Sequence, residues 1–493
     1  MKKFLFHFFC FLPLVSHANL IPLPDSSERL AHLHLQVQRE LDLFNFPPGQ
    51  WIEPRKTSDE AHVYDVVIIG GGQTGMTIAV ALKKEKVDNI LIFDENKEGY
   101  EGPWLTYARM ANLLTPKSIT GPDCHLTSLT CRSWFEAKYG VEQWERISCV
   151  PRQTWAEYLH WLRTSLNLPI VNETKVGALQ WKEEENCFLV PIESPEGSSQ
   201  VYARKIVLAT GYQGSGRWSI PDFVVERLPK SLYNSVYETI DFNNVRGKKI
   251  GICGAGLSAF DTALICSEHG AKEIHLFLRR EKFANQYVKW PEYTGFLKHF
   301  PDLSDSDKWR FISKMFDLGE PPTQDSINRL KTLDNVFLHF DSLLVDAEER
   351  EGEARVFTAR DSYDLDHLFI SVGCEIDLGL REELSTFSEE IALWGDRFSP
   401  PPEDENTGML YLPYLGKHFE FVEKNPGSAP YLQSIFNCTG AALLSEGVCP
   451  GVSLKGSKYS VQKLVYGVTS QLFLEEKERY FNAPNETVPY LDN

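Results

Sequence analysis

Two glycine-rich turns constrain this chain more than any other feature of its sequence. Residues 63–82 read VYDVVIIGGGQTGMTIAVAL, and residues 248–261 read KKIGICGAGLSAFD. Each turn follows an apolar run with strand character and opens into a segment with helical character. A strand, a glycine turn and a helix in that order begin a doubly wound parallel sheet. The pattern predicts an α/β fold with two Rossmann-like, three-layer dinucleotide-binding domains.

The first turn has the spacing of a dinucleotide site. Gly70 makes the tight turn, Gly72 lets the backbone approach a pyrophosphate, and Gly75 allows close packing of helix on strand. The next strand ends in Asp94, where a carboxylate accepts hydrogen bonds from ribose hydroxyls, with Glu95 as the neighbouring alternative. A glycine-rich turn without a ligand is the competing interpretation.

The second turn differs from the first at the end of its second strand. Gly254 and Gly256 fill the first two glycine positions, and Ala259 fills the packing position. The strand EIHLFLRR then ends in Arg279 and Arg280, which suit a 2'-phosphate through charge-assisted hydrogen bonds. A solvated strand end is the alternative for these arginines. An acid at one site and arginines at the other predict FAD in the first and NADPH in the second, with hydride transfer between them.

Two further strands end in small residues that can lie beside a cofactor. The segment ARKIVLATGYQG places Thr210 and Gly211 at its strand end, and LDHLFISVGCEIDL places Gly373 there. Either strand alone is compatible with an ordinary turn. With the two glycine turns, they add to the expectation of cofactor sites at strand ends.

Composition excludes several classes of function. The chain has 493 residues, of which 42% are hydrophobic and 24% charged, enough for a large core and two or three domains. Its net charge of -18 argues against a nucleic-acid partner and leaves small molecules. Neither a Cys-x-x-Cys pair nor a His-x-x-x-His spacing occurs, so we expect no metal site. A hydrolase turn of the Gly-x-Ser-x-Gly type is also missing.

The pattern of turn and linker residues along the chain predicts five segments. The NADPH-binding domain interrupts a discontinuous FAD-binding domain, and a helical insertion near 289–335 interrupts the NADPH-binding domain. The predicted segments are a signal-like leader (1–18), an amphipathic helix and linker (19–60), the first part of the FAD domain (61–215), the NADPH domain (216–373), and the second part of the FAD domain with a C-terminal helix (374–493).

The location in the cell stays open, because two signals conflict. The leader MKKFLFHFFCFLPLVSHA joins a basic head to an apolar run and small residues, which indicates export or tethering to a membrane. That run is too short to span a bilayer as a helix, and no other run is long enough. Ten cysteines, of which one lies in the leader, look like scattered reduced thiols and favour the cytoplasm, as does the demand for FAD and NADPH.

Over roughly residues 63–473 the chain resembles the flavin-containing monooxygenase-like family of flavoproteins. The likeness rests on both glycine turns, on VLATG and DHLFISVG, and on EGPW, where Trp104 matches the family's Gly-Gly-x-Trp segment. The segments LTPKSITGPD and IFNCTGAALLSEG are similar to those of a bacterial subgroup of FAD/NAD(P)-binding oxidoreductases. In the second segment, the resemblance implies that Thr439 and Gly440 lie near the flavin ring.

The resemblance implies a reaction. NADPH reduces FAD, dioxygen adds to give a flavin hydroperoxide, and a small nucleophile such as an amine, thioether or ketone takes one oxygen atom. Such chemistry needs a dry pocket. The aromatic segments 128–140 and 285–300 are candidates for its wall, with core packing as the alternative for their rings. No catalytic residue is singled out, and the oligomeric state is not specified.

Two departures from the family pattern keep other functions open. The Phe-x-Gly-x-x-x-His fingerprint expected before the second turn is missing, although Asn234 and Ser235 offer polar groups there. Leu114 stands where typical members have an asparagine near the flavin. These departures favour an NADPH oxidase or reductase that inserts no oxygen. A non-catalytic flavoprotein is the third hypothesis.

Overall fold

A computed structural model describes residues 20–482, apart from residues 215, 287, 320, 405 and 452. The predicted leader, residues 1–18, lies outside the described residues. Within the described part of the chain, no helix combines the length and the apolar character needed to cross a bilayer. The structure is an α/β protein with one mixed and one parallel sheet as its main sheets.

The larger sheet has nine strands and is mixed. Its centre is parallel: β2 lies between β3 and β8, and β19 pairs with the far side of β8, while β7 is antiparallel to β8. Because β19 comes from the last part of the chain, this sheet joins segments from both sides of the second sheet. The strands are β1 (Arg55–Lys56), β2 (His62–Ile69), β3 (Ile90–Phe93), β4 (Ile170–Val171), β5 (Lys175–Val176), β6 (Gln180–Lys182), β7 (Cys187–Ser194), β8 (Gly197–Leu208) and β19 (Ile435–Asn437).

The second sheet has five parallel strands, in the order β10-β17-β11-β12-β13. Its strands β11 and β17 are largely buried, and apolar side chains of α7 (Leu257–Glu268) and α10 (Gln324–Lys331) pack into one core with the sheet. Near-continuous apolar strands are typical of a parallel sheet covered by helices. The strands are β10 (Tyr233–Ser235), β11 (Lys249–Cys253), β12 (Glu273–Phe277), β13 (Val336–His339) and β17 (His367–Ile370).

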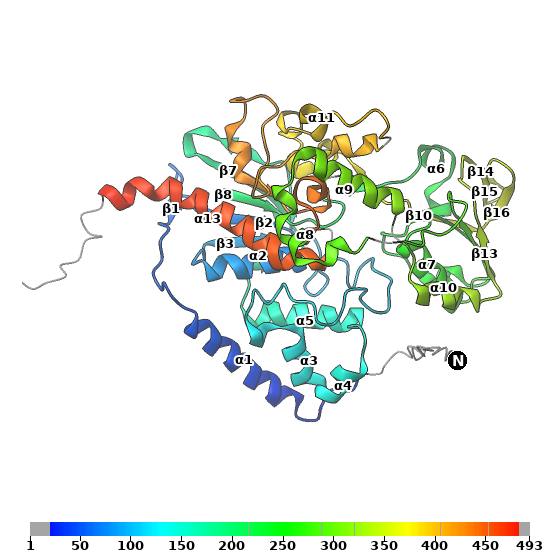
Figure 1. The fold of residues 1–493 in the computed structure, drawn as a ribbon, viewed down its shortest axis with the longest axis horizontal. Coiled ribbons are helices and arrows are strands. Elements are labelled where there is room, and N and C mark those ends of the chain that lie inside the picture. The colour runs from blue at the N-terminus through cyan, green and yellow to red at the C-terminus, as the bar shows by residue number, and fades with distance from the viewer. Residues whose placement is uncertain are drawn as a thin grey trace, which may run out of the picture.

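Two short sheets complete the strand inventory. An antiparallel meander of β14 (Asp346–Arg350), β15 (Glu353–Phe357) and β16 (Ser362–Leu365) lies beside the second sheet (Figure 1). Strands β9 (Gly216–Trp218) and β18 (Cys374–Ile376) pair antiparallel, with Trp218 opposite Cys374. The two passages of the chain between the large sheets therefore run side by side as a two-stranded link.

Helices from the first part of the chain and the C-terminal helix α13 pack around the larger sheet (Figure 1). The predicted amphipathic helix is α1, which buries Leu33 and Val37 and packs on α3. The predicted C-terminal helix is α13, whose stripe of Val461, Leu464 and Val468 is buried and which packs on α2. The helices are α1 (Ser26–Leu43), α2 (Gln73–Lys84), α3 (Cys131–Tyr139), α4 (Val141–Arg146), α5 (Arg152–Ser165) and α13 (Ser457–Asn482).

The predicted helical insertion is present, and it contacts both halves of the molecule. Helix α9 packs on α12, next to the first sheet, whereas α10 packs on α7 of the second sheet. Trp309 of α9 donates a hydrogen bond to Asp404 (2.6 Å). The α-helices of the insertion are α8 (Thr294–His299), α9 (Asp305–Leu318) and α10. Elsewhere in the described chain lie α6 (Asp222–Arg227), α11 (Trp394–Arg397) and α12 (Leu443–Glu446).

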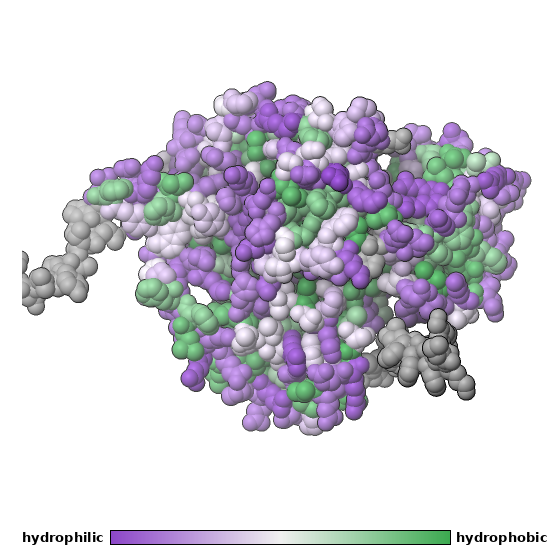
Figure 2. Space-filling view, in the orientation of Figure 1, coloured by the Kyte–Doolittle hydropathy of each residue, from purple (hydrophilic) through white to green (hydrophobic). Residues whose placement is uncertain are grey.

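The surface is mostly polar on the face drawn in Figure 2, with apolar side chains on the right, over the second sheet, and at the lower left, over α1. Leu35 and Leu43 of α1 are exposed there. The nine cysteines of the described chain are all free thiols, and most are buried. This agrees with the expectation of reduced core thiols.

Candidate functional site

A cavity of about 1180 Å³ lies where the two large sheets face each other. Its wall includes both glycine turns and the ends of β8 and β17. In doubly wound sheets, ligands bind at the carboxyl ends of the strands, where these turns lie. The sequence-predicted residues that line it are Gly70, Gly72, Asp94, Glu95, Trp104, Thr210, Gly211, Gly254, Gly256, Arg279, Arg280 and Gly373.

Four predicted residues do not line the cavity. Gly75 and Ala259 lie inside α2 and α7, as packing positions should. Thr439 is fully buried and bonds Asn437 through its hydroxyl, and Gly440 packs against the backbone of Tyr212. Thr439 and Gly440 therefore lie behind the cavity wall. Gly451, which packs against Thr439, lines the cavity instead.

The first turn requires glycine at two places. Gly70 has φ +106°, and a Cβ there would stand 2.4 Å from the Ala209 carbonyl oxygen. A Cβ on Gly75 would stand 2.0 Å from the Gly70 carbonyl oxygen, so the helix packs directly on the turn. Gly72 is the N-cap of α2, whose first N–H groups can face an anion.

Asp94 lines the cavity and also bonds the first turn itself. Its Oδ2 accepts a hydrogen bond from the Gly71 N–H (2.8 Å), and its Oδ1 accepts one from the Asn96 N–H (2.8 Å). Burial is the main cause that raises the pKa of this carboxyl. These bonds secure the turn and still leave acceptor capacity on the carboxylate. Glu95, the neighbouring alternative, is exposed on the cavity wall, and the ribose contact of either acid stays a prediction.

The second turn provides an open cradle. Gly254 has φ +141°, and a Cβ there would stand 2.2 Å from the Ser371 carbonyl oxygen. A Cβ on Gly256, in contrast, would meet no described atom within 4 Å. Gly256 is the N-cap of α7 and lines the cavity. The space in front of it suits a phosphate group at the helix N-terminus.

The two arginines after β12, Arg279 and Arg280, make different contacts. The guanidinium of Arg280 donates to the carbonyl oxygens of Leu318 (3.0 Å) and Asp317 (3.2 Å), so it caps the end of α9. Arg279 is exposed on the cavity wall, and within the described chain no ion pair involves it. The predicted phosphate contact therefore falls to Arg279 more than to Arg280.

Three buried polar atoms on the cavity wall lack a hydrogen-bond partner within the described chain. They are Nε1 of Trp104, Nε of Arg109 and Oγ1 of Thr210. Buried donors without partners are costly, and such groups mark places where a ligand completes the hydrogen bonding. Together with the two cradles, these atoms fit a cavity built to hold dinucleotides.

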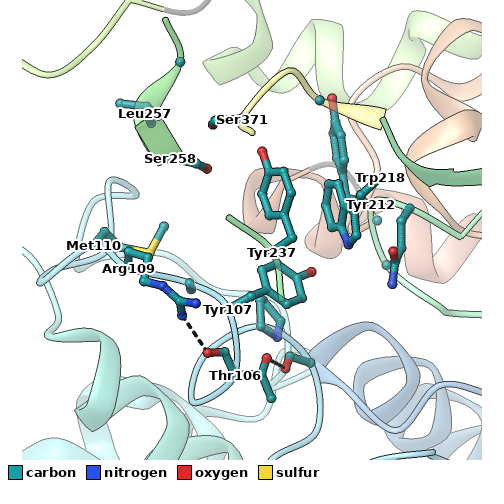
Figure 3. Close-up of a pocket in the computed structure, with 18 of the residues that line it drawn as sticks. Thr106, Tyr107, Arg109, Met110, Tyr212, Trp218, Tyr237, Leu257, Ser258 and Ser371 are labelled. Carbon is teal, nitrogen blue, oxygen red and sulfur yellow. Dashed lines mark hydrogen bonds between the residues drawn. The ribbon is translucent and has the colours of Figure 1, made fainter. Parts of the chain in front are cut away.

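A cluster of four aromatic residues, which sequence reasoning missed, stands in the middle of the cavity wall (Figure 3). Trp218 stacks on Tyr237 (centroids 3.6 Å apart, 14° between planes) and on Tyr212 (6.1 Å, 13°). Tyr107 meets Trp218 and Tyr237 edge-on, and burial raises its pKa to about 12. Each residue comes from a different segment, so no local pattern could reveal the cluster.

No described residue of the two aromatic segments expected to wall the pocket lines it. Trp134 and Phe135 of the first segment are buried in the core of the larger sheet, and Phe300 of the second packs with Trp309. Core packing, the alternative, describes these rings.

The polar groups proposed for the missing fingerprint also lie outside the cavity wall. Asn234 donates to Glu238 (2.6 Å), and the buried Ser235 accepts from the Tyr237 N–H (3.3 Å). Leu114 does line the cavity and is exposed to it.

Comparison with curated proteins decides the family. The chain is 35% identical over 455 residues to the FAD-dependent urate hydroxylase of Xanthomonas campestris pv. campestris, covering 92% of this chain and 95% of that protein. This chain belongs to the class B flavin monooxygenases. It is a FAD-dependent monooxygenase that uses NAD(P)H, as its homologues do. The family model for pyridine nucleotide-disulphide oxidoreductases matches residues 67–294 of this monooxygenase.

More distant relatives share the fold. The monooxygenase is 26% identical over 205 residues to a Baeyer-Villiger monooxygenase of Pseudomonas aeruginosa, covering 39% of this chain and 33% of that one. Ornithine hydroxylase of the same species superposes with a TM-score of 0.65 at 13% identity, over 83% of this chain and 100% of that one. The ornithine N-hydroxylase of Kutzneria sp. 744, described with reduced FAD, NADP+ and L-ornithine, gives 0.62 at 16%, over 83% and 99%.

Proposed function

We propose that this monooxygenase uses NADPH to hydroxylate a small, planar, electron-rich substrate, with urate as the first candidate. The observation that carries the proposal is the aromatic cluster of Tyr107, Tyr212, Trp218 and Tyr237 between the two glycine turns. Aromatic faces stack on flat rings and keep water away from the reacting atoms. The urate hydroxylase activity named for the Xanthomonas relative points to the same substrate shape.

The cofactors divide between the two turns in this proposal. The turn at Gly70 and Gly72 holds the FAD pyrophosphate and Glu95 its ribose, while Gly256 and Arg279 hold the pyrophosphate and 2'-phosphate of NADPH. When bound, FAD takes a hydride from NADPH and activates dioxygen. The unpartnered donors of Trp104 and Thr210 complete their hydrogen bonds on the bound dinucleotides.

The domain arrangement predicted from the sequence is part of the proposal. Residues 61–215 and 374–493 form one FAD-binding domain, and residues 216–373 form the NADPH-binding domain between them. Support comes from the pairing of β19 with β8 within one sheet and from the paired strands β9 and β18 at the two crossings. Substrate and both nicotinamide and flavin rings would meet at this junction.

Arg109 gives the substrate site its charge. Its Nη1 donates to the Thr106 carbonyl oxygen (2.7 Å) and its Nη2 to that of Glu238 (2.9 Å), and no carboxylate of the described chain pairs with it. Burial and the nearby Arg152 lower its pKa. A half-buried cation with only neutral partners favours an anionic ligand. A flat anion such as urate meets both requirements of this wall, charge and aromatic faces.

Coupled turnover tests the proposed function. The FAD-loaded enzyme is mixed with NADPH or NADH, and NADPH oxidation, urate loss and peroxide release are followed with and without urate. We expect reduction by NADPH at least tenfold more efficient than by NADH, with one urate consumed per NADPH. Rapid NADPH oxidation with peroxide release and no urate loss would support the oxidase alternative instead.

Tyr237→Ala probes the aromatic cluster. Removing the ring that stacks on Trp218 should raise the KM for urate about tenfold, since base–aromatic stacking contributes about 1–3 kcal/mol. The rate of flavin reduction by NADPH should stay within twofold. Tyr293→Ala is the matched control, because Tyr293 is exposed and does not line the cavity.

A further inference from the structure

A loop beside the larger sheet, residues 102–115, reaches the second sheet across the cavity. Most of its residues line the cavity wall. The Nη2 group of Arg109, in the middle of this loop, donates to the carbonyl oxygens of Glu238 (2.9 Å) and Val236 (3.5 Å), just after β10 of the second sheet. Its Nη1 group donates to the Thr106 carbonyl oxygen of the loop itself (2.7 Å). One planar cation therefore bonds both sides of the junction.

The loop is firmly attached on its own side. Arg152, the first residue of α5, donates to the carbonyl oxygens of Met110 (3.0 Å) and Trp104. Trp104 packs edge-on against Trp155 of α5 (centroids 6.3 Å apart), and both rings are buried in the core of the larger sheet. The position of the loop is therefore set by the half of the molecule that is built on the larger sheet.

The accepting turn is attached equally well to the second sheet. Val236 is buried in the core that this sheet forms with α7 and α10, and its N–H donates to the Ile370 carbonyl oxygen at the end of β17 (2.9 Å). The Glu238 carboxylate accepts from Asn234 of β10 (2.6 Å). Because both sides are anchored, a shift of one sheet relative to the other would break the bonds of Arg109.

Two ring contacts reinforce the same junction. The Arg109 guanidinium lies over the ring of Phe242 (5.4 Å to the centroid), which packs against the core of the second sheet. Tyr107 of the same loop meets Tyr237 edge-on (5.7 Å). Figure 3 shows Arg109, with its bond to Thr106, on the loop that also carries Tyr107. The loop therefore contacts the second sheet next to the aromatic cluster.

We propose that Arg109 is a positioning residue, which holds the two sheets in the arrangement that forms the cavity before a ligand binds. This inference rests on the proposed function, in which NADPH reaches from the second turn to the flavin and so contacts both walls. A ligand that meets a preformed cavity loses no binding free energy to bringing the walls together. A lysine in place of Arg109 would keep the charge but lack the planar fork that bonds both sides at once.

The test measures the binding of NADP+ and urate to the FAD-loaded Arg109→Lys, Arg109→Gln and Arg29→Lys variants. Arg29→Lys is the matched control. The Arg29 guanidinium also donates to two carbonyl oxygens, those of Ala137 (3.2 Å) and Glu136 (3.4 Å), but it joins α1 to α3 outside the cavity wall. Equilibrium dialysis gives the Kd of each ligand, alone and at a saturating concentration of the other.

The expected pattern separates positioning from direct contact. In wild type and Arg29→Lys, the Kd of each ligand should change less than about twofold when the other is added, because the cavity is already formed. Arg109→Lys should bind each ligand alone about tenfold more weakly, and either ligand should restore the affinity for the other. Arg109→Gln should bind urate weakly even with NADP+, because this variant also lacks the charge.

Limited proteolysis gives a readout that does not depend on urate. Without NADP+, the β9 and β18 segments of FAD-loaded Arg109→Lys should be cut faster than those of Arg29→Lys, because the two sheets are held together less firmly. Saturating NADP+ should remove this difference. Faster cutting throughout the chain that NADP+ does not slow would overturn the proposal, because it indicates a general loss of stability.

The contrary outcomes separate this role from the proposed function. Equal Kd values and cutting rates for Arg109→Lys and Arg29→Lys would overturn the role of Arg109 and leave the proposed function intact. A loss of urate affinity in Arg109→Lys that NADP+ does not restore would also overturn it, because Arg109 would then act by direct contact alone. Wild-type enzyme that binds NADP+ but no urate would overturn the proposed substrate, and the NADP+ affinities and cutting rates would then decide the role of Arg109.

Discussion

At the residue scale, glycines in similar turns differ in what surrounds them. Gly75 packs against Gly70, whereas Gly256 faces open space at the N-terminus of α7, with φ −86°. A side chain at Gly75 would collide with the backbone of Gly70, whereas one at Gly256 would only occupy space in the cavity. The two residues therefore separate a structural role from a binding role.

Gly256→Ala should leave the free energy of unfolding of the protein within about 0.5 kcal/mol of wild type. The added methyl group occupies the space proposed for a phosphate of NADPH, so the KM for NADPH should rise at least tenfold. Steady-state kinetics and chemical denaturation measure both effects. Gly295→Ala is the control, since a Cβ there also meets open space but outside the cavity wall. Unchanged NADPH kinetics would count against the second cradle.

Arg279→Ala should reduce the preference for NADPH. Loss of one charged hydrogen-bond donor costs about 1.5–3 kcal/mol, so the KM for NADPH should rise about 10- to 100-fold while that for NADH stays nearly constant. Arg217→Ala, at an exposed arginine paired with Glu375, should change neither value. An equal effect on both coenzymes would place the 2'-phosphate elsewhere.

At the element scale, a buried ionic cluster fastens α13 to the larger sheet. Arg204 and Lys205 of β8 are almost fully buried, and both pair with Glu475 of α13, at 2.7 Å and 2.6 Å. Arg204 also pairs with Asp65 of β2 (3.2 Å). The last helix of the chain therefore holds the strand that carries VLATG to the cavity.

Glu475→Gln should lower the free energy of unfolding by about 3 kcal/mol, because two buried cations lose their main partner. Urea denaturation measures this change. Glu382→Gln, which breaks the exposed pair with Lys175, should cost at most about 1 kcal/mol. Similar losses in both variants would mean that the cluster is not an anchor.

Glu446 makes stability depend on pH where α12, α9 and α13 meet. Burial raises its pKa from the ordinary 4.5 to about 7, although Lys463 pairs with it at 2.9 Å. Because the folded pKa lies above the unfolded one, folding favours the protonated form. Its stabilising contribution is complete below about pH 4.5 and is lost as the pH rises through about 7.

In wild type, the free energy of unfolding should therefore fall more steeply between pH 5 and 8 than in Glu446→Gln. Urea denaturation at several pH values compares the two slopes. Parallel slopes would show that Glu446 titrates normally in the folded protein.

At the scale of the whole molecule, the cavity is lined from both sheets, and the paired strands β9 and β18 lie where the chain passes between the sheets. Helix α9 adds a second connection, since Arg280 caps it from the second sheet while its Trp309 bonds Asp404. A ligand that contacts both walls should hold the two halves together.

NADP+ should consequently stabilise the FAD-loaded enzyme. At a concentration of 100 times its Kd, binding adds about 2.7 kcal/mol to stability and raises Tm. Limited proteolysis should also cut the β9 and β18 segments more slowly. Arg279→Ala at the same NADP+ concentration should show a smaller Tm shift. Equal shifts in both proteins would argue against coenzyme binding at this wall.

The sequence alone determined the two glycine turns, their strands and helices, and the long terminal helices. These features are local: neighbouring residues determine the turn geometry at Gly70 and Gly254 and the apolar stripe of α13. The same locality allowed the cofactor classes to be predicted from the residues at two strand ends.

Only the tertiary structure decided which partners the side chains of the cavity wall contact. Asp94 and Arg280 match the expected spacing, and the structure adds bonds that spacing does not reveal, to the Gly71 N–H and to the end of α9. Trp218 and Tyr237 stack on the cavity wall, although no local sequence pattern predicts that contact. Hydrogen-bond partners and packing neighbours are set by segments far apart in sequence, and only the folded chain brings these segments together.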